Sequence, residues 1–123
     1  MANLLIVDDE ADVREFAANF FRKRKINVTT AQSGEESLDM LDKVKPDLIL
    51  LDIKMSGIDG IETLKRVKEK DKNIKVIMVT GRKPDDQEAF EKCRQFGALD
   101  YIHKPLELEE LERIVLKNIK SIS

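Results

Sequence analysis

Residues 48–52 read Leu-Ile-Leu-Leu-Asp, four aliphatic side chains followed at once by a carboxylate. An unbroken aliphatic run of this kind is typical of a strand buried on both faces of a parallel sheet. Similar runs stand at Leu4–Val7 and Val76–Val79, and more polar ones at Val28–Ala31 and Leu99–Ile102. The sequence therefore predicts five strands, of which Val28–Ala31, with its two threonines, suits an edge of the sheet.

Helical patterns fill the intervals between these strands. Ser33 and Asp59 each precede a glutamate by three residues, which is a capping signal for a helix start. Strict alternation of strands and helices with short connections implies a parallel sheet covered by helices on both faces. The first helix should bury one apolar face made of Val13, Phe16, Ala17, Phe20 and Phe21.

Length and composition restrict the kind of protein. The chain has 123 residues, 41% of them hydrophobic, and a formal net charge of -2. This length favours one domain, and the near balance of charge argues against a dedicated nucleic-acid binder. Cys93 is the single cysteine, and no apolar stretch approaches a signal peptide or a membrane span. We expect one domain over residues 1–123, without an effector domain, in the cytoplasm.

Polar side chains stand where the predicted strands end. Asp8 and Asp9 follow the first strand, Asp52 the third, Thr80 the fourth, and Lys104 comes shortly after the fifth. Because the carboxyl ends of parallel strands meet at one edge of a sheet, we expect these side chains to share a ligand crevice. Acidic residues close to strand ends are often solvated or cap a helix, and this is our expectation for the adjacent Glu10.

Three clustered carboxylates must either retain protons or hold a cation among them. At roughly 4 Å and an effective dielectric constant near 20, each pair of charges costs about 4 kcal/mol. The motifs offer oxygen ligands without histidine or cysteine, which favours Mg²⁺, Mn²⁺ or Ca²⁺ over zinc or copper, and open positions for water and phosphate suit Mg²⁺ best. A carboxylate can also act as a nucleophile and form an aspartyl phosphate. Mg²⁺, Lys104 and the Thr80 hydroxyl would then face the charge of the transferred phosphoryl group.

The order and spacing of these motifs support a family resemblance. The chain resembles the receiver domains of two-component response regulators along essentially its whole length. The segments that carry the resemblance are Ile6-Val7-Asp8-Asp9-Glu10, Leu50-Leu51-Asp52-Ile53-Lys54-Met55, Gly57 to Gly60, Val79-Thr80-Gly81, and Gly97-Ala98 leading to Tyr101 and Lys104-Pro105.

The resemblance implies a fold and a function. The fold is a doubly wound (βα)5, flavodoxin-like α/β fold, with a parallel sheet in the order 2-1-3-4-5 and helices on both faces. The function is that of a signalling phosphoacceptor, which catalyses its own phosphorylation and slow dephosphorylation but is not otherwise an enzyme. The phosphoryl donor is a sensor histidine kinase or a histidine phosphotransfer protein. The signal passes to a protein target rather than to nucleic acid or membrane. The domain itself is a monomer or a weak phosphorylation-dependent dimer.

The resemblance also implies residue roles. Asp52 accepts the phosphoryl group, and Lys104 contacts the phosphoryl oxygens. Asp9, Asp52 and the backbone carbonyl of Lys54 bind Mg²⁺, with Asp8 acting through water. Thr80 and Tyr101 form the switch that changes the surface of the last two helices and the last strand. The Lys104-Pro105 bond is expected to be cis.

Two positions and the length of one segment depart from the family's usual pattern. Ser56 stands where proline is most common, and Gly81 stands where alanine or serine is more usual. The segment from Thr80 to Lys104 is slightly long. Separately, Lys54 is a long cation two residues past Asp52, and we expect it to shield the phosphoryl group and slow its loss.

Three other functions compete with this interpretation. A phosphohydrolase of the haloacid dehalogenase type would need Asp-x-Asp, whereas Asp52 is followed by Ile53 and Lys54. A flavin carrier would need a first loop that binds the cofactor's phosphate, and Asp8 and Asp9 would repel that phosphate. A degenerate receiver that only binds proteins would have lost an acid, the threonine or the lysine. Output through a phosphorelay, through docking, or as part of a longer regulator stays open.

Overall fold

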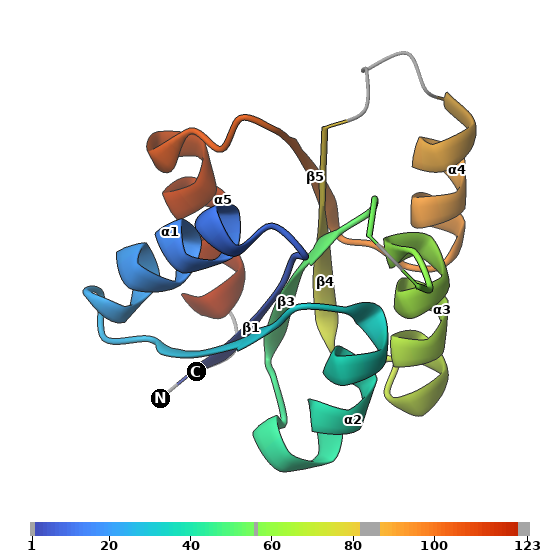
Figure 1. Ribbon diagram of the computed structural model, residues 1–123, viewed down its shortest axis with the longest axis horizontal. Helices are drawn as coiled ribbons and strands as arrows, with labels where there is room; N and C mark the ends of the chain where they lie inside the picture. The colour runs from blue at the N-terminus through green and yellow to red at the C-terminus, as the bar shows by residue number, and fades with distance from the viewer. Residues whose placement is uncertain (1, 56, 82–86, 121–123) are drawn as a thin grey trace.

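The computed structural model describes residues 2–55, 57–81 and 87–120, and Ser56 and the segment 82–86 lie outside this description. Five parallel strands form one sheet in the order β2-β1-β3-β4-β5. Five helices alternate with them (Figure 1). The strands are β1 (Asn3–Val7), β2 (Asn27–Ala31), β3 (Leu48–Asp52), β4 (Lys75–Thr80) and β5 (Asp100–His103). The helices are α1 (Ala11–Arg22), α2 (Gly34–Val44), α3 (Gly60–Lys70), α4 (Gln87–Gln95) and α5 (Leu108–Lys120).

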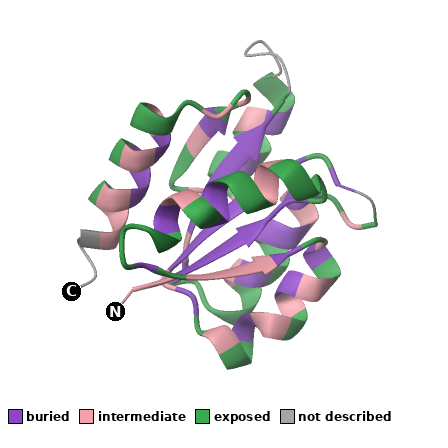
Figure 2. Ribbon diagram, turned by 60° about the vertical axis from the view of Figure 1, so that its left-hand side comes forward, coloured by how far each residue is buried: buried purple, intermediate pink, exposed green. Residues whose placement is uncertain are grey.

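The helices cover both faces of the sheet, so the predicted doubly wound topology and strand order are confirmed. Helices α1 and α5 lie on one side, and α2, α3 and α4 lie on the other (Figure 1). A hydrophobic core lies on each face of the sheet, and alternate residues of β1 belong to opposite cores. Leu4 and Ile6 pack with α1 and α5, whereas Leu5 packs with the other three helices. All five residues of β3 are buried, and the central strands form the purple interior of Figure 2.

Two predicted helix starts are confirmed at the level of single hydrogen bonds. The Ser33 hydroxyl accepts from the backbone N–H of Glu36 at 3.1 Å, and the Asp59 carboxylate accepts from the N–H of Glu62 at 2.9 Å. Each bond satisfies one of the amide groups that a helix leaves open at its first turn. These caps fix where α2 and α3 begin. The start of α3 in turn lies against the strand end that carries Asp52, because the Gly60 N–H donates to the carbonyl of Ile53.

Two sequence predictions about apolar residues are wrong. Leu99 does not begin the last strand: it is 50% exposed, and β5 runs from Asp100 to His103. Phe16 is 47% exposed, whereas Ala17 and Phe21 of the same helix are buried. Residue 16 stands at the border of the apolar stripe, and a helical pattern does not show how far the neighbouring elements reach around a helix. Within the described ranges, no helix is both long and apolar enough to cross a membrane.

Candidate functional site

The candidate site lies at the carboxyl edge of the sheet, where β1, β3 and β4 end next to one another. Pairing of Val7 with Leu51 and of Asp52 with Val79 places the residues that follow these strands side by side. Asp8 and Asp52 are almost completely buried there. Thr80, the last residue of β4, is fully buried on the other side of β3. The geometry therefore brings together polar groups that lie far apart in the sequence.

Lys104 reaches this edge from the far end of the chain. Its backbone N–H donates to the carbonyl of Thr80 at 2.7 Å, which ties the end of β5 to the end of β4. Its ammonium nitrogen lies 3.2 Å from Asp8 Oδ2 and 3.5 Å from Asp52 Oδ2. The peptide bond to Pro105 is cis. One half-buried cation thus faces two buried carboxylates.

Burial and charge alter the protonation of Asp52. Burial, together with the charge of Asp8, raises the pKa of Asp52 to about 6 from its ordinary value of 3.8, although the Lys104 charge opposes the rise. The carboxylates therefore repel each other at neutral pH, and Lys104 only partly compensates. A further cation between the carboxylates would remove this repulsion.

The pKa of Lys104 is raised as well, although for a different reason. Burial alone would lower the pKa of Lys104, but the hydrogen bond that Lys104 donates to Glu10 and the charges of Asp52 and Asp8 raise this pKa above its ordinary value. The hydrogen bond and the charge of Lys104 likewise lower the pKa of Glu10. Lys104 is consequently a permanent cation in this site at any physiological pH.

The donor set fits a hard divalent cation. Carboxylate oxygens of Asp8, Asp9, Glu10 and Asp52 all lie within 4.8 Å of one another. Such oxygen ligands match Mg²⁺ or Mn²⁺ and do not match zinc or copper. The residues present therefore suit a magnesium ion at the position that the sequence predicts.

Comparison with known proteins decides the family. A model of the response regulator receiver domain matches residues 4–116. The chain is a receiver domain. Transfer of a phosphoryl group to an aspartate is the general function of this family, and its members bind Mg²⁺ at an acidic pocket. Receiver domains are phosphorylated by histidine kinases and signal to downstream effectors.

Individual relatives agree with this assignment. Sporulation initiation phosphotransferase F of Bacillus subtilis is 38% identical over 114 residues, which cover 93% of this chain and 90% of the relative. A CheY-like receiver domain protein of Methanospirillum hungatei matches with a TM-score of 0.92 at 26% identity, covering 98% of this chain and 95% of that one. Response regulator TrrA of Thermotoga maritima, solved with Mg²⁺-BeF, matches with a TM-score of 0.85 at 30% identity, covering 96% and 99%. Several other curated relatives are longer, and the chain spans half of their length or less.

Two contacts hold the acidic edge of the receiver domain in shape. Arg14 donates to the backbone carbonyl of Asp8 at 2.8 Å and so supports the end of β1. The N–H of Gly60 donates to the carbonyl of Ile53 at 2.7 Å, which brings the first turn of α3 against the end of β3. A Cβ atom at residue 60 would overlap the carbonyl oxygen of Asp52 and lie 2.7 Å from Ile53 Cα. Only glycine allows this close approach.

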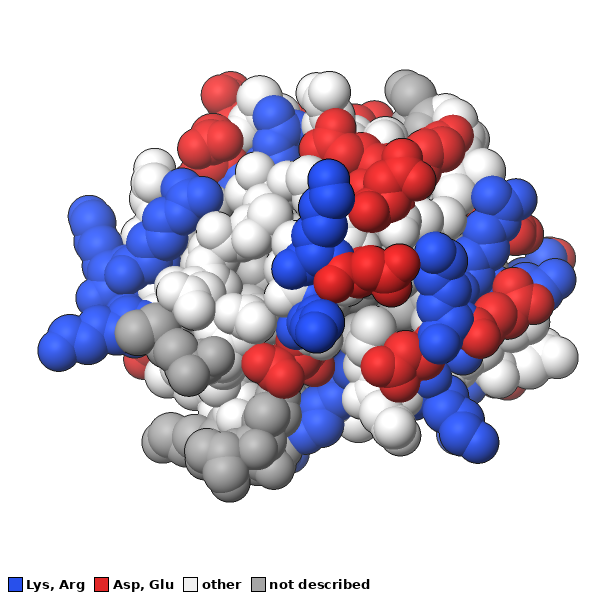
Figure 3. Space-filling model, turned by 90° about the horizontal axis from the view of Figure 1, so that it is seen from below, with Lys and Arg blue, Asp and Glu red and all other residues white. Residues whose placement is uncertain are grey.

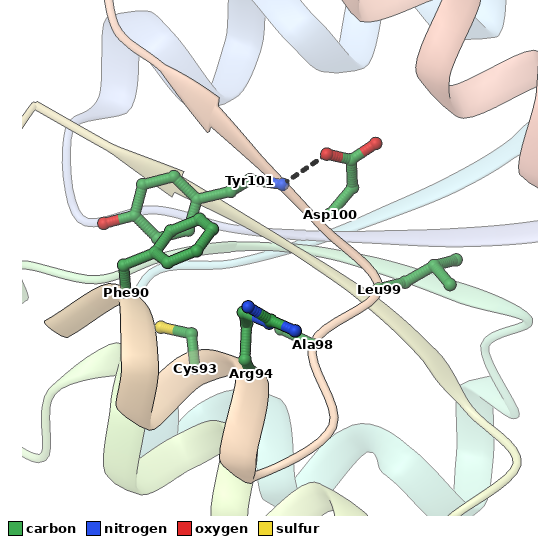
Figure 4. Close-up of a pocket in the computed structure, with 7 residues that line it drawn as sticks. All are labelled: Phe90, Cys93, Arg94, Ala98, Leu99, Asp100 and Tyr101. Carbon is green, nitrogen blue, oxygen red and sulfur yellow. Dashed lines mark hydrogen bonds between the residues drawn. The ribbon is translucent and has the colours of Figure 1, made fainter. Parts of the chain in front are cut away.

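Tyr101 lies apart from the carboxylates, on the side of β5 that faces α4. Its half-buried ring meets the Phe90 ring edge-on, with centroids 5.1 Å apart, and the His103 ring at 5.2 Å. In Figure 4 the Tyr101 ring lies beside Phe90, with its hydroxyl end pointing away from Asp100 and Leu99. The surrounding hollow has a volume of about 200 Å³. The receiver domain therefore has space next to the predicted switch residue.

The structure also places a residue whose role the sequence interpretation missed. Glu10 precedes α1 but makes no side-chain cap hydrogen bond there. Its carboxylate instead accepts from the Lys104 ammonium at 2.8 Å. The Glu10 side chain is exposed, as expected, but it does not cap the helix, and its contact with Lys104 was not predicted. The signal that could have indicated this role was the run of three consecutive acids from Asp8 to Glu10, because it places Glu10 next to two predicted site residues.

Proposed function

We propose that Asp52 is the residue that accepts the phosphoryl group, from a phosphohistidine on a sensor kinase or a histidine phosphotransfer protein. The observation that carries this proposal is the position of Asp52 at the end of the central strand β3, buried and 3.5 Å from the Lys104 ammonium. Asp8 is also buried but is flanked by Asp9 and Glu10, which continue the acidic side of the site. Among the described residues, Asp52 is thus the acid of this cluster that ends the central strand of the sheet.

The proposed reaction exchanges one phosphorus bond for another. A carboxylate oxygen of Asp52 forms a bond to phosphorus as the bond to the donor's imidazole nitrogen breaks, and that imidazole takes up a proton. Lys104 and the Thr80 hydroxyl would stabilise the charge on the phosphoryl oxygens. Burial of Asp52 keeps bulk water away from the acyl phosphate once it has formed.

We infer that Asp8, Asp9, Asp52 and the backbone carbonyl of Lys54 hold the Mg²⁺ ion, and that Mn²⁺ can replace it. The support is the cluster of carboxylate oxygens described above. When bound, the ion would supply positive charge opposite the transferring phosphoryl group. Lys54 itself is exposed and lies two residues after Asp52 in the sequence.

We further propose that the signal leaves through Thr80 and Tyr101. An added phosphoryl group would draw the Thr80 hydroxyl toward Asp52, and Tyr101 would turn inward behind it. The Phe90 contact and the hollow between α4 and β5 give the ring two environments to exchange. The altered surface of α4, β5 and α5 would then bind a downstream protein in the cytoplasm. The receiver would act as a monomer or as a weak dimer formed on phosphorylation.

Intact mass after incubation with acetyl phosphate and Mg²⁺ tests the acceptor. Wild type should gain one phosphoryl group, and EDTA should abolish the gain. Asp52→Asn should show no gain, whereas Asp71→Asn, the same substitution at an exposed aspartate elsewhere, should behave as wild type. A folded wild type that binds Mg²⁺ without gaining mass would instead indicate a degenerate receiver that only binds proteins.

The proposed shielding by Lys54 has its own test. Once phosphorylated, the Lys54→Asn variant should lose its phosphoryl group faster than wild type, because the shorter side chain leaves water a freer approach. The decay is followed by intact mass after removal of acetyl phosphate. Lys65→Asn, which changes an exposed lysine of α3, serves as the control. Equal decay in wild type and Lys54→Asn would refute the shielding role.

A further inference from the structure

Glu10 is the closest described partner of the Lys104 ammonium. The distance to Glu10 Oε1 is 2.8 Å, against 3.2 Å to Asp8 Oδ2 and 3.5 Å to Asp52 Oδ2. The backbone of Glu10 is held as well, because its N–H donates to Asp8 Oδ1 at 2.9 Å. The Glu10 carboxylate therefore attracts the Lys104 ammonium from a backbone position that is itself held by a hydrogen bond.

The three carboxylates around Lys104 differ in their access to water. The side chains of Asp8 and Asp52 are 4% and 3% exposed, whereas that of Glu10 is 62% exposed. An exposed carboxylate is well solvated when it stands alone, so Glu10 can release Lys104 at little cost. A buried carboxylate has no such alternative. Glu10 is thus the partner that Lys104 can exchange.

We propose that Glu10 restrains phosphorylation of Asp52 by competing with the phosphoryl group for Lys104. This inference rests on the proposed function of Asp52 and Lys104. Before transfer, the ammonium is partly neutralised by its short contact with Glu10. During transfer, Lys104 exchanges Glu10 for the phosphoryl oxygens, and Glu10 returns to water. Glu10 acts through Lys104 and is therefore a positioning residue that sets how readily the site accepts a phosphoryl group.

The competing interpretation is that Glu10 helps to bind the metal, because one of its oxygens belongs to the 4.8 Å cluster. The two roles predict opposite effects of removing the charge. If Glu10 binds the metal, its loss should lower Mg²⁺ affinity and slow phosphorylation at limiting Mg²⁺. If Glu10 competes for Lys104, its loss should leave Mg²⁺ bound and make the Lys104 ammonium more available to the phosphoryl group. Mg²⁺ affinity must therefore be measured separately from phosphorylation.

The test compares Glu10→Gln with Glu15→Gln, which removes the same charge from an exposed residue of α1. At saturating Mg²⁺, the rate of phosphorylation by acetyl phosphate should rise about two- to fivefold in Glu10→Gln, the range expected for loss of an exposed ion pair. Affinity for beryllofluoride, a stable phosphoryl analogue, should rise by a similar factor. Mg²⁺ affinity should stay within about twofold of wild type, and Glu15→Gln should change none of the three quantities.

A second variant separates contact from charge. Glu10→Asp keeps the charge but shortens the side chain by one methylene, which withdraws the carboxylate from a lysine that Asp8 and Asp52 hold in place. It should behave like Glu10→Gln if contact with Lys104 matters. Equal rates in Glu10→Gln and Glu15→Gln, a slower Glu10→Gln, or an Asp variant identical to wild type would each overturn the inference. A wild type that gains no phosphoryl group would refute the proposed function instead.

Discussion

The two edges of the sheet carry aspartates that are used in different ways. At the amino edge, Asp47 accepts a hydrogen bond from the backbone N–H of Asn3 at 2.8 Å, and Asp71 accepts one from Asn73 at 2.9 Å. Figure 3 views the molecule from this edge and shows acidic and basic side chains interspersed on the surface. At the carboxyl edge, Asp8 and Asp52 are buried and face one another across Lys104. Each aspartate of the first pair accepts a backbone hydrogen bond, whereas the carboxylates of the second pair repel each other.

A hollow by itself does not mark the functional edge of the sheet. The amino edge has a hollow of about 540 Å³, lined by aspartates and lysines in near balance. Balanced, exposed charges attract no particular ion, because they are already screened by water and by each other. The carboxyl edge concentrates charge of one sign where water is scarce. A functional site in this fold is therefore indicated by buried, uncompensated charge rather than by the volume of a hollow.

The largest expected effect comes from crowding the carboxyl edge. Gly60→Ala should lower the free energy of unfolding by about 3 kcal/mol, because the new methyl group overlaps the backbone of Asp52. Gly97→Ala, at the amino edge, should cost only about 1.5 kcal/mol. That residue has φ +96, but its Cβ would meet only the flexible Lys68 side chain at 3.4 Å. Urea unfolding measures both costs, and a larger loss at Gly97 would contradict the comparison.

Removal of the buried charge should stabilise the metal-free protein. The folded-state pKa of Asp52, about 6, lies above its ordinary 3.8. The contribution of this residue to stability is therefore complete below about pH 4 and is lost as the pH rises through 6. Asp52→Asn avoids that loss, so in EDTA at pH 7.5 it should exceed wild type by about 2 kcal/mol, with little difference near pH 4. Urea unfolding at both pH values checks this.

Added Mg²⁺ supplies the control for that measurement. The ion should stabilise wild type more than Asp52→Asn, because only wild type keeps the full set of repelling carboxylates. The advantage of Asp52→Asn should therefore shrink when Mg²⁺ replaces EDTA. An advantage that is equal at pH 4 and pH 7.5, or that is insensitive to Mg²⁺, would show that buried charge is not its origin.

The opposite sign is expected for an aspartate at the amino edge. Asp47→Ala removes the acceptor for the Asn3 N–H and should lower the free energy of unfolding by about 1 kcal/mol. Because Asp47 lies far from the acidic cluster, Mg²⁺ affinity should not change. Urea unfolding and a Mg²⁺ titration on the same samples give both values. A change in Mg²⁺ affinity would show that the two edges are coupled.

The smallest effect is expected at Gly81, directly after Thr80. A Cβ atom at this residue would have nothing within 4 Å. Gly81→Ala should raise the free energy of unfolding by about 0.5 kcal/mol, because alanine restricts the unfolded chain. Thermal unfolding resolves a change of this size. A clear loss would indicate that the carboxyl edge is crowded beyond Thr80 as well as around Asp52.

The sequence was a good guide to elements whose side chains are buried on every side. Leu48 to Leu51 form β3 as expected, because only a strand buried on both faces tolerates an unbroken aliphatic run. Phe16 and Leu99 were misplaced because they stand at the ends or borders of such patterns. At these positions, exposure depends on how neighbouring elements pack. Periodicity along one segment does not contain that information.

The candidate site likewise has a part that the sequence could predict and a part that it could not. Asp8, Asp52 and Thr80 could be placed together because strand direction alone brings strand ends to one edge. The pairing of Glu10 with Lys104 could not be placed, because it joins residues 94 positions apart through two flexible side chains. Its geometry depends on the loop after β5 and on rotamers, and neither of these has a sequence signature.

Tyr101 also gives this protein a built-in optical probe. The chain has one tyrosine and no tryptophan. Ultraviolet fluorescence excited near the tyrosine band therefore comes from a single ring, which packs against Phe90 and His103 at the end of the sheet opposite β2. Quantum yield and anisotropy of that emission report the surroundings of one side chain in solution. A rearrangement of β5 that changes the surroundings of this ring can thus be followed in real time on the unlabelled, unmodified protein.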